Sequence, residues 1–168
     1  MTGEQNLLTI LEYAVLFVFF YFFQSMIYVY SIHLFSNHPV RWKLYFICAF
    51  LSMVATYLAR QLTYGVHTLY SLIALILLAV VLLRIPAQKV VKSALLIALL
   101  TLVFELVISL VCIAIIGKDS YTEFLKTNRG KSVIGILVNL MLALSLVPVY
   151  FYKKNKARRE GGNNGKTG

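Results

Sequence analysis

The chain has 168 residues, of which 60% are hydrophobic and 13% are charged. A soluble domain is nearer half apolar and a quarter charged, and the apolar residues here come in runs close to the roughly 20 residues that cross a bilayer. A formal net charge of +10 would suggest nucleic acid in a soluble protein. Here the basic residues lie at the ends of apolar runs, where topology explains them. Composition therefore predicts an integral membrane protein with the lipid bilayer as its partner and no nucleic-acid partner.

The first apolar run covers residues 7–35 and is followed by Pro39, which breaks the helix because it lacks a backbone donor. No Lys or Arg precedes the run, and it is longer than the apolar part of a signal peptide, so we expect a retained helix. The next apolar stretch is too long for one crossing. Gly65 divides it into helices over residues 44–64 and 66–83. One crossing plus a re-entrant piece is the alternative for this stretch.

The second half begins with a basic linker, residues 84–92, which leads into a predicted helix over residues 93–116. The polar connection that follows contains Tyr121, Phe124 and Leu125, which are spaced for one face of a short interfacial helix. A last helix is predicted over residues 132–152. The basic, Gly- and Asn-rich tail, residues 153–168, is predicted to be disordered.

The distribution of basic residues sets the orientation. With the C-terminus in the cytoplasm, most of the 16 Lys and Arg residues lie on the cytoplasmic side, as the positive-inside rule requires. The connection between the last two helices is the exception, because it is more basic than an outer loop usually is. The sequence thus predicts an all-α, polytopic transmembrane bundle in residues 1–152, with five helices, the N-terminus outside and the C-terminus inside.

Polar residues within the apolar runs are the candidate site. Glu105 lies in the middle of residues 93–116, where a charge costs about 2.5–3.5 kcal/mol on insertion scales. We expect the polar faces of several helices to meet inside the bundle and to bind a ligand or a partner through Glu105, Gln24, Asn139, Thr56, Arg60, Thr101 and Ser109. Two alternatives stay open: the carboxyl group only fixes helix packing through hydrogen bonds, or it pairs with Arg60.

The tail offers a second candidate contact. Its cations would attract anionic lipid headgroups at about 1 kcal/mol each, although a flank that stops translocation explains them equally well; they are Lys153, Lys154, Lys156, Arg158 and Arg159. The two cysteines and three histidines are isolated from one another in the sequence. No metal site and no cofactor is therefore expected.

Signatures of enzymes are missing from the sequence. It contains no glycine-rich phosphate loop, no Ser/His/Asp arrangement, and neither HExxH nor CxxC. No polar stretch is long enough to bury the core of a catalytic domain. We therefore expect a protein that is not an enzyme.

The order of features in the second half resembles a known module. Pro86 and Lys89 precede a helix with the internal triplet Phe104-Glu105-Leu106, followed by Gly117, an amphipathic stretch over residues 121–128 and a last helix that ends in Tyr152-Lys153-Lys154-Asn155. Over about residues 60–155 this resembles the N-terminal membrane sensor module of AgrC-like, GHKL-type histidine kinases of Gram-positive bacteria. The resemblance implies a sensor of peptide pheromones or envelope signals in the bacterial plasma membrane.

The chain departs from these kinases because it has no phospho-acceptor His in a cytoplasmic helix and no nucleotide-binding boxes. The resemblance then implies a stand-alone sensor or adaptor, or a truncated receptor, that acts on a membrane or cytoplasmic signalling partner or as a homo-oligomer. Two other hypotheses are open. One is a small-solute or ion transporter, or its substrate-binding membrane subunit. The other is a structural or pore-forming membrane interaction protein.

Overall fold

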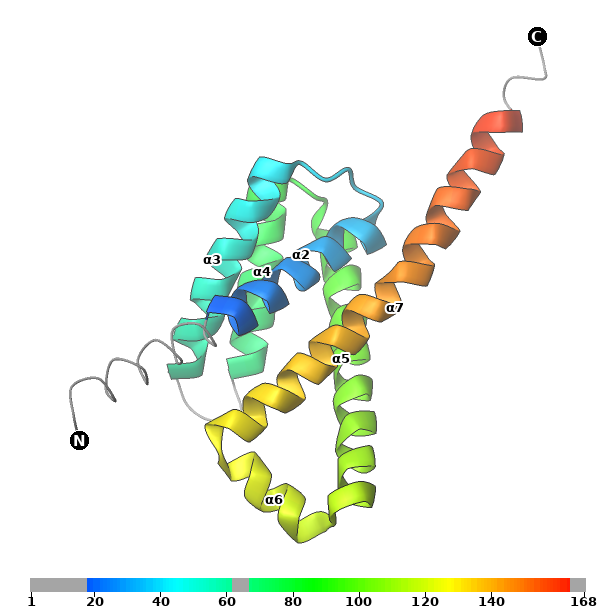
Figure 1. Cartoon of the computed structure of the whole chain (residues 1–168). Helices are drawn as coiled ribbons and strands as arrows, with labels where there is room; N and C mark the ends of the chain where they lie inside the picture. The colour runs from blue at the N-terminus through cyan, green and yellow to red at the C-terminus, as the bar shows by residue number, and fades with distance from the viewer. Residues whose placement is uncertain (1–17, 62–66, 164–168) are drawn as a thin grey trace.

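The computed structural model describes residues 18–61 and 67–163, and every regular element in this part of the chain is a helix (Figure 1). The predicted all-α class is confirmed. In chain order the elements are a π-helical turn η1 (Val18–Phe22), α2 (Phe23–Ser36), α3 (Trp42–Gln61), α4 (His67–Leu83), α5 (Ala87–Ile116), α6 (Lys118–Lys126) and α7 (Asn128–Asn163).

The helices have the length and composition of membrane spans. Within the described ranges, α3, α5 and α7 are each long and apolar enough to cross a bilayer, and α4 is a shorter apolar helix. The turn η1 and helix α2 form the described part of the first predicted helix, whose residues 7–17 lie outside the described residues. The chain is thus a helical membrane protein with several membrane-spanning helices.

Successive helices alternate in direction, as five crossings require. In Figure 1, α2 and α4 end where α3 and α5 begin, and α7 returns to the same end of the bundle. The connections at this end carry Arg41 and Arg84, and the cations of the tail lie in the last part of α7. Opposite, α6 joins α5 to α7. The structure contains no bilayer, so the cytoplasmic location of the first end stays a prediction.

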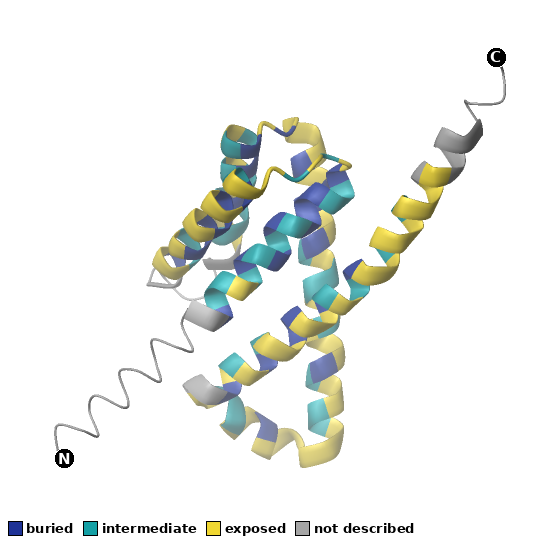
Figure 2. Ribbon diagram, turned by 45° about the horizontal axis from the view of Figure 1, so that its top comes forward, coloured by how far each residue is buried: buried dark blue, intermediate teal, exposed yellow. Residues whose placement is uncertain are grey.

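Helix α2 is the centre of the bundle, because it packs against α3, α4, α5 and α7. Figure 2 shows its buried and half-buried surface, which includes the fully buried Val29 and Ile32. Tyr45 of α3 donates a hydrogen bond from its hydroxyl group to the backbone oxygen of Met26, at 2.9 Å. Small residues on one face of α3, among them the buried Ala49, let the neighbouring helices approach closely.

Helices α2 and α7 run side by side in the same direction in both views (Figures 1 and 2). Near their beginnings, the ring of Phe20 lies against Gly135, so close that a Cβ atom at Gly135 would be 2.6 Å from the ring carbon Cζ. Near their ends, the ammonium group of Lys153 donates to the backbone oxygen of Leu34 at 2.5 Å and to Oδ1 of Asn37 at 2.6 Å. These contacts fix the register of the α2–α7 pair.

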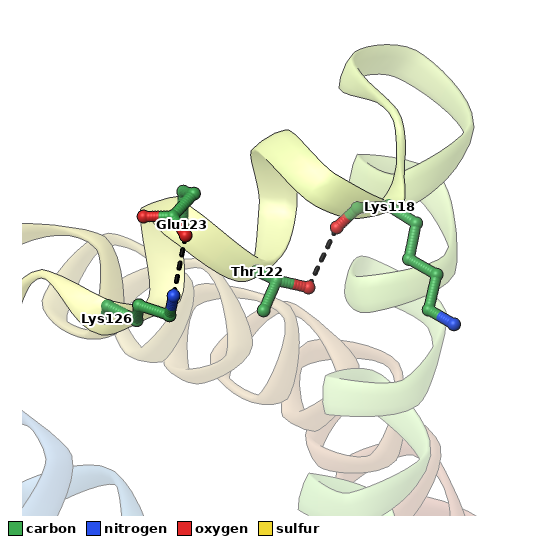
Figure 3. Close-up of polar contacts among 4 residues, drawn as sticks. All are labelled: Lys118, Thr122, Glu123 and Lys126. Carbon is green, nitrogen blue, oxygen red and sulfur yellow. Dashed lines mark hydrogen bonds and ion pairs between the residues drawn. The ribbon is translucent and has the colours of Figure 1, made fainter.

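The short amphipathic helix predicted around Tyr121 is confirmed as α6. Tyr121 is buried and Phe124 and Leu125 are half-buried against α5 and α7. The opposite face is polar: Lys126 pairs with Glu123 at 2.6 Å, and the hydroxyl group of Thr122 donates to the backbone oxygen of Lys118 (Figure 3).

Thr127 links α6 to α7, and its side chain caps the C-terminus of α6 and the N-terminus of α7. Its hydroxyl group donates to the backbone oxygen of Phe124 at 2.7 Å and accepts the backbone N–H of Gly130 at 2.9 Å. The second contact is the usual N-cap interaction, in which a Ser or Thr oxygen satisfies a free amide of the first turn. Gly130 is needed here because a Cβ atom would overlap the backbone oxygen of Phe124.

Several predicted helix boundaries are wrong. Helix α5 begins at Ala87 instead of residue 93, because Pro86 supplies a suitable backbone angle and its oxygen accepts the first amides of the helix. Helix α7 begins at Asn128 instead of residue 132 and continues to Asn163, so residues 153–163 are helical instead of disordered. Lys, Arg, Ala and Glu, which are good helix formers, dominate most of that segment.

Residues 44–83 form two separate helices, α3 and α4, which pack along each other, and whether both cross the bilayer stays a prediction. The predicted turn at Gly65 lies outside the described residues, which omit 62–66.

Candidate functional site

A polar link connects the middle of α2 to α5. The side-chain amide of Gln24 donates to the hydroxyl oxygen of Tyr28 at 3.1 Å, and this oxygen lies 3.5 Å from Oγ1 of Thr101. Thr101 donates its own proton to the backbone oxygen of Ile97 at 2.8 Å. Tyr28 is therefore the donor toward Thr101, at the long limit of a hydrogen bond. The three side chains form one directed chain that ends on the backbone.

Two buried amide oxygens lie on the α2–α7 seam without a hydrogen-bond partner: Oε1 of Gln24 and Oδ1 of Asn139. Asn139 is only 3% exposed. Gln24 follows Phe20 by four positions and Asn139 follows Gly135 by four positions, and Phe20 contacts Gly135. A buried acceptor left unpaired costs about 1–3 kcal/mol. The seam therefore presents two acceptors that an N–H or O–H group would satisfy.

Glu105 does not belong to this interior layer, and the prediction that it faces the bundle interior is wrong. Its side chain is exposed on the outward face of α5. The inward face of this helix is formed instead by Ile97, Thr101, Phe104 and Ile108, which are buried or half-buried and spaced three or four residues apart. Glu105 follows Phe104 directly and is therefore turned about 100° away from that face.

The surroundings of Glu105 are apolar and open. It lies in a shallow groove of about 310 Å³ that is lined only by residues of α5: Leu102, Glu105, Leu106, Ser109 and Leu110. Glu105 forms no hydrogen bond or ion pair with any described residue. Of the described acidic side chains it alone lies within an apolar span, since Asp119 and Glu123 are on α6. In a bilayer this face of α5 presents a carboxyl group toward the hydrocarbon.

The other predicted site residues have different surroundings, although Ser109 lines the same groove as Glu105. Ser109 is half-buried, and its oxygen accepts a 2.7 Å hydrogen bond from the hydroxyl group of Tyr121, so it serves the contact of α5 with α6. Thr56 is half-buried on α3. In the described ranges α3 packs against η1, α2 and α4 but not against α5 or α7. The Arg60 side chain lies outside the described residues, so the predicted pair with Glu105 stays a prediction.

The tail cations divide into two kinds. Lys153 is half-buried and bound to the end of α2, and its contact with lipid headgroups stays a prediction. Lys154, Lys156 and Arg158 are exposed, and Lys154 lies over the ring of Tyr150. The side chain of Arg159 is outside the described residues. The bond from Lys153 satisfies a free carbonyl at the C-terminus of α2, where a positive charge is also favourable.

Sequence reasoning missed the contact between His33 and His38, which it treated as isolated. Their rings are 6.0 Å apart, and Nδ1 of the buried His33 lies 3.3 Å from the backbone oxygen of His38. Five-residue spacing across the end of α2 is the signal that could have found it. No group of three or more His, Cys, Asp or Glu side chains that could hold a metal ion occurs within the described part of the chain.

No family model, no curated protein and no solved structure matches this chain.

Proposed function

We propose that the chain is a non-enzymatic membrane sensor or adaptor. It binds a partner helix within the bilayer through the Glu105 face of α5 and reports through the cytoplasmic part of α7. One observation carries this proposal: the exposed carboxyl group of Glu105 in the middle of a leucine-rich helix face. The resemblance of the second half to sensor modules of histidine kinases agrees with it.

The hydrocarbon of a bilayer does not satisfy the carboxyl group of Glu105. Hydrocarbon supplies no hydrogen-bond partner, and polar groups inside a membrane are costly unless another protein segment satisfies them. A partner helix can satisfy the carboxyl group and also pack against the leucines around it. Leu102 and Leu106 on either side of Glu105 are 62% and 57% exposed. A helix laid along this face would cover all three side chains.

The proposed output is α7, which continues as one helix from Asn128 to Asn163. It packs against α5 along its apolar part, and Lys153 binds it to the end of α2. A displacement of α5 or α2 is therefore passed to the segment that follows Lys153. Helix α7 remains continuous across Pro148, and a continuous helix is a suitable element for passing such a displacement along the chain.

A partner-stabilising structural subunit is the second candidate, since an exposed carboxyl group in a membrane span serves permanent assembly as well as sensing. The position of Glu105 does not favour a carrier. Carriers bind their solute near the midplane between helices, often at broken ones, and the groove beside Glu105 is lined by one unbroken helix.

The proposal is tested by photo-crosslinking from the two sides of the bundle in bacterial membranes. A photoreactive residue at Leu102 of α5 is compared with one at Leu77 of α4, which is similarly exposed at 59%. We expect a defined adduct from position 102 only, and its loss in Glu105→Leu. Glu123→Gln on α6 is the matched control and should leave the adduct unchanged.

Equal adducts from both positions, or an adduct that persists in Glu105→Leu, would contradict the assignment of this face. A transcriptional reporter of the cell's response then separates the two candidates. A sensor loses signalling with Glu105→Leu, whereas a structural subunit loses the abundance of its partner.

A further inference from the structure

We propose that the last part of α7 binds anionic phospholipid headgroups through Lys154 and Arg158, beside the ring of Tyr150. The partner is the leaflet in which this end of the bundle lies, and not an acidic protein. The proposal goes beyond the sensor or adaptor function and does not depend on Glu105.

The basic segment of α7 is an ordered surface. Helix α7 continues to Asn163, and in both views its last part projects beyond the other helices (Figures 1 and 2). In a helix each basic side chain has a fixed direction, whereas a disordered tail would offer only its total charge. The positions of the cations around α7 therefore decide what they can bind together.

Tyr150, Lys154 and Arg158 form one exposed stripe along α7. They follow one another at steps of four residues, which places them on the same side of a helix. The ammonium group of Lys154 lies 5.8 Å from the centre of the Tyr150 ring, within the range of a cation–π contact. Lys153 lies about 100° away around the helix, and it is bound to the end of α2. Lys153 thus fixes how the helix is turned and leaves the stripe free for another contact.

The stripe lies at the depth of the lipid headgroups. Tyr150, Phe151 and Tyr152 end the apolar part of α7 and are 42%, 54% and 70% exposed, as in the aromatic belt at a membrane surface. Along the helix axis, Lys154 follows Tyr152 by about 3 Å and Arg158 by about 9 Å. The headgroup region is about 5–8 Å thick on each side of the hydrocarbon, and the surface potential extends about a Debye length further. Both cations are therefore within reach of the headgroups.

Charge selects anionic over zwitterionic lipid. Every charged residue in 150–159 is basic, and the first acidic residue of the tail, Glu160, follows them. Arg41 and Arg84 are exposed in the connections at the same end of the bundle. The described acidic side chains lie only on α5 and α6. Each cation close to an anionic surface strengthens binding by about fivefold.

A flank that stops translocation also explains a basic segment, but that role depends on how many cations follow the span. The lipid site depends on where each cation lies around the helix. Moving one charge around α7 without changing their number therefore separates the two explanations.

The test is quenching of a tryptophan by brominated lipid around the purified full chain. Trp42, the one tryptophan of the chain, is changed to Phe, and Tyr150→Trp places the fluorophore in the stripe, where an indole ring keeps the contact with a cation. The protein is reconstituted into phosphatidylcholine vesicles that contain increasing amounts of brominated phosphatidylglycerol or brominated phosphatidylcholine. The ratio of the two quenching curves measures the preference for the anionic headgroup.

We expect the anionic lipid to be preferred at position 150. The preference should fall about fivefold in Lys154→Gln and further in the double variant with Arg158→Gln. Raising the salt concentration to about 0.5 M should weaken it as well, because salt screens exposed charges.

Two variants are matched controls, and circular dichroism checks the helix content of each. Lys118→Gln removes one exposed cation at the opposite end of the bundle and should leave the preference unchanged. The double variant Lys154→Gln with Asn155→Lys keeps the number of charges but moves one by about 100° away from the stripe, and it should recover less than half of the loss.

Equal quenching by the two brominated lipids, or a preference that Lys154→Gln leaves unchanged, would overturn the proposal. Full recovery in the shifted variant would also overturn it, because the total charge would then be sufficient, as in a translocation flank.

Discussion

Helices α2 and α5 place a polar side chain in two different surroundings. Helix α2 packs against four other helices, and its Gln24 is linked to Tyr28 and, through it, to Thr101 of α5. The outward face of α5 touches no other described helix, and its Glu105 has no partner in the described chain. Both residues lie in apolar runs. What separates them is the direction that each side chain takes, since one direction leads to a neighbour and the other to lipid.

The difference gives the two residues different roles. A polar group that finds its partner within the chain stabilises one arrangement of the helices. A polar group that is exposed to lipid without a partner is satisfied only when something else binds, which makes it a site of association. Changes on the α2–α7 seam should therefore alter the stability of the single chain, and changes on the outward face of α5 should alter what the chain associates with.

The largest expected effect comes from the core beside the seam. Leu142→Ala removes a side chain that is 0% exposed and should lower the free energy of unfolding by about 2–4 kcal/mol, because it leaves a cavity. Leu144→Ala on the same helix removes one that is 62% exposed and should change it by less than about 0.5 kcal/mol. Reversible unfolding in mixed detergent micelles measures both. Equal losses would mean that α7 does not present Leu142 to the bundle.

The next effect tests the close approach of α7 to η1. In Gly135→Ala the new Cβ atom would lie 2.6 Å from Cζ of Phe20, and the overlap should reduce stability by about 1–3 kcal/mol. The double variant with Phe20→Leu should recover part of this loss, since the obstructing ring atom is gone. The same unfolding assay gives the coupling energy. Additive losses would show that the two residues are not in contact.

A smaller effect is expected where α7 holds the end of α2. Lys153→Met removes two hydrogen bonds, to Leu34 and Asn37, and leaves a helix C-terminus without its cation. The free energy of unfolding should fall by about 1–2 kcal/mol. Lys92→Met, which removes an exposed cation near the start of α5, is the control and should have little effect. Hydrogen exchange of the last turn of α2 should rise in the first variant only.

The smallest expected effect compares two polar residues of α5, the inward Thr101 and the outward Glu105. Thr101→Val breaks the link to Tyr28 and should reduce stability by about 0.6 kcal/mol, the average for interhelical hydrogen bonds in a membrane protein. Tyr28→Phe should reduce stability further, because it also removes the acceptor of the Gln24 side-chain amide. Glu105→Gln, four residues further along α5, should leave the unfolding of the single chain unchanged in dilute micelles. A loss as large as that of Thr101→Val would place Glu105 in the interior after all.

Features that depend on neighbours in the sequence could be predicted well. The amphipathic face of α6 is one, because Tyr121, Phe124 and Leu125 contrast with the charged residues around them. The break at Pro39 is another, because it depends on the chemistry of one residue. Within the candidate site, Gln24, Thr101 and Asn139 were correctly expected in the interior, since polar or small residues recur on those faces at helical spacing.

The sequence by itself thus determined that this is a membrane protein of apolar helices, because the bilayer requires long apolar runs and satisfied backbones. It did not determine which face of each helix is inward. Lipid and bundle interior are equally apolar, so the hydrophobic pattern that orients a helix in a soluble protein is lost. Only the tertiary structure decided that Glu105 faces outward and that Lys153 holds the end of α2, a contact between residues 119 positions apart. Such contacts depend on how the helices pack, which no local pattern encodes.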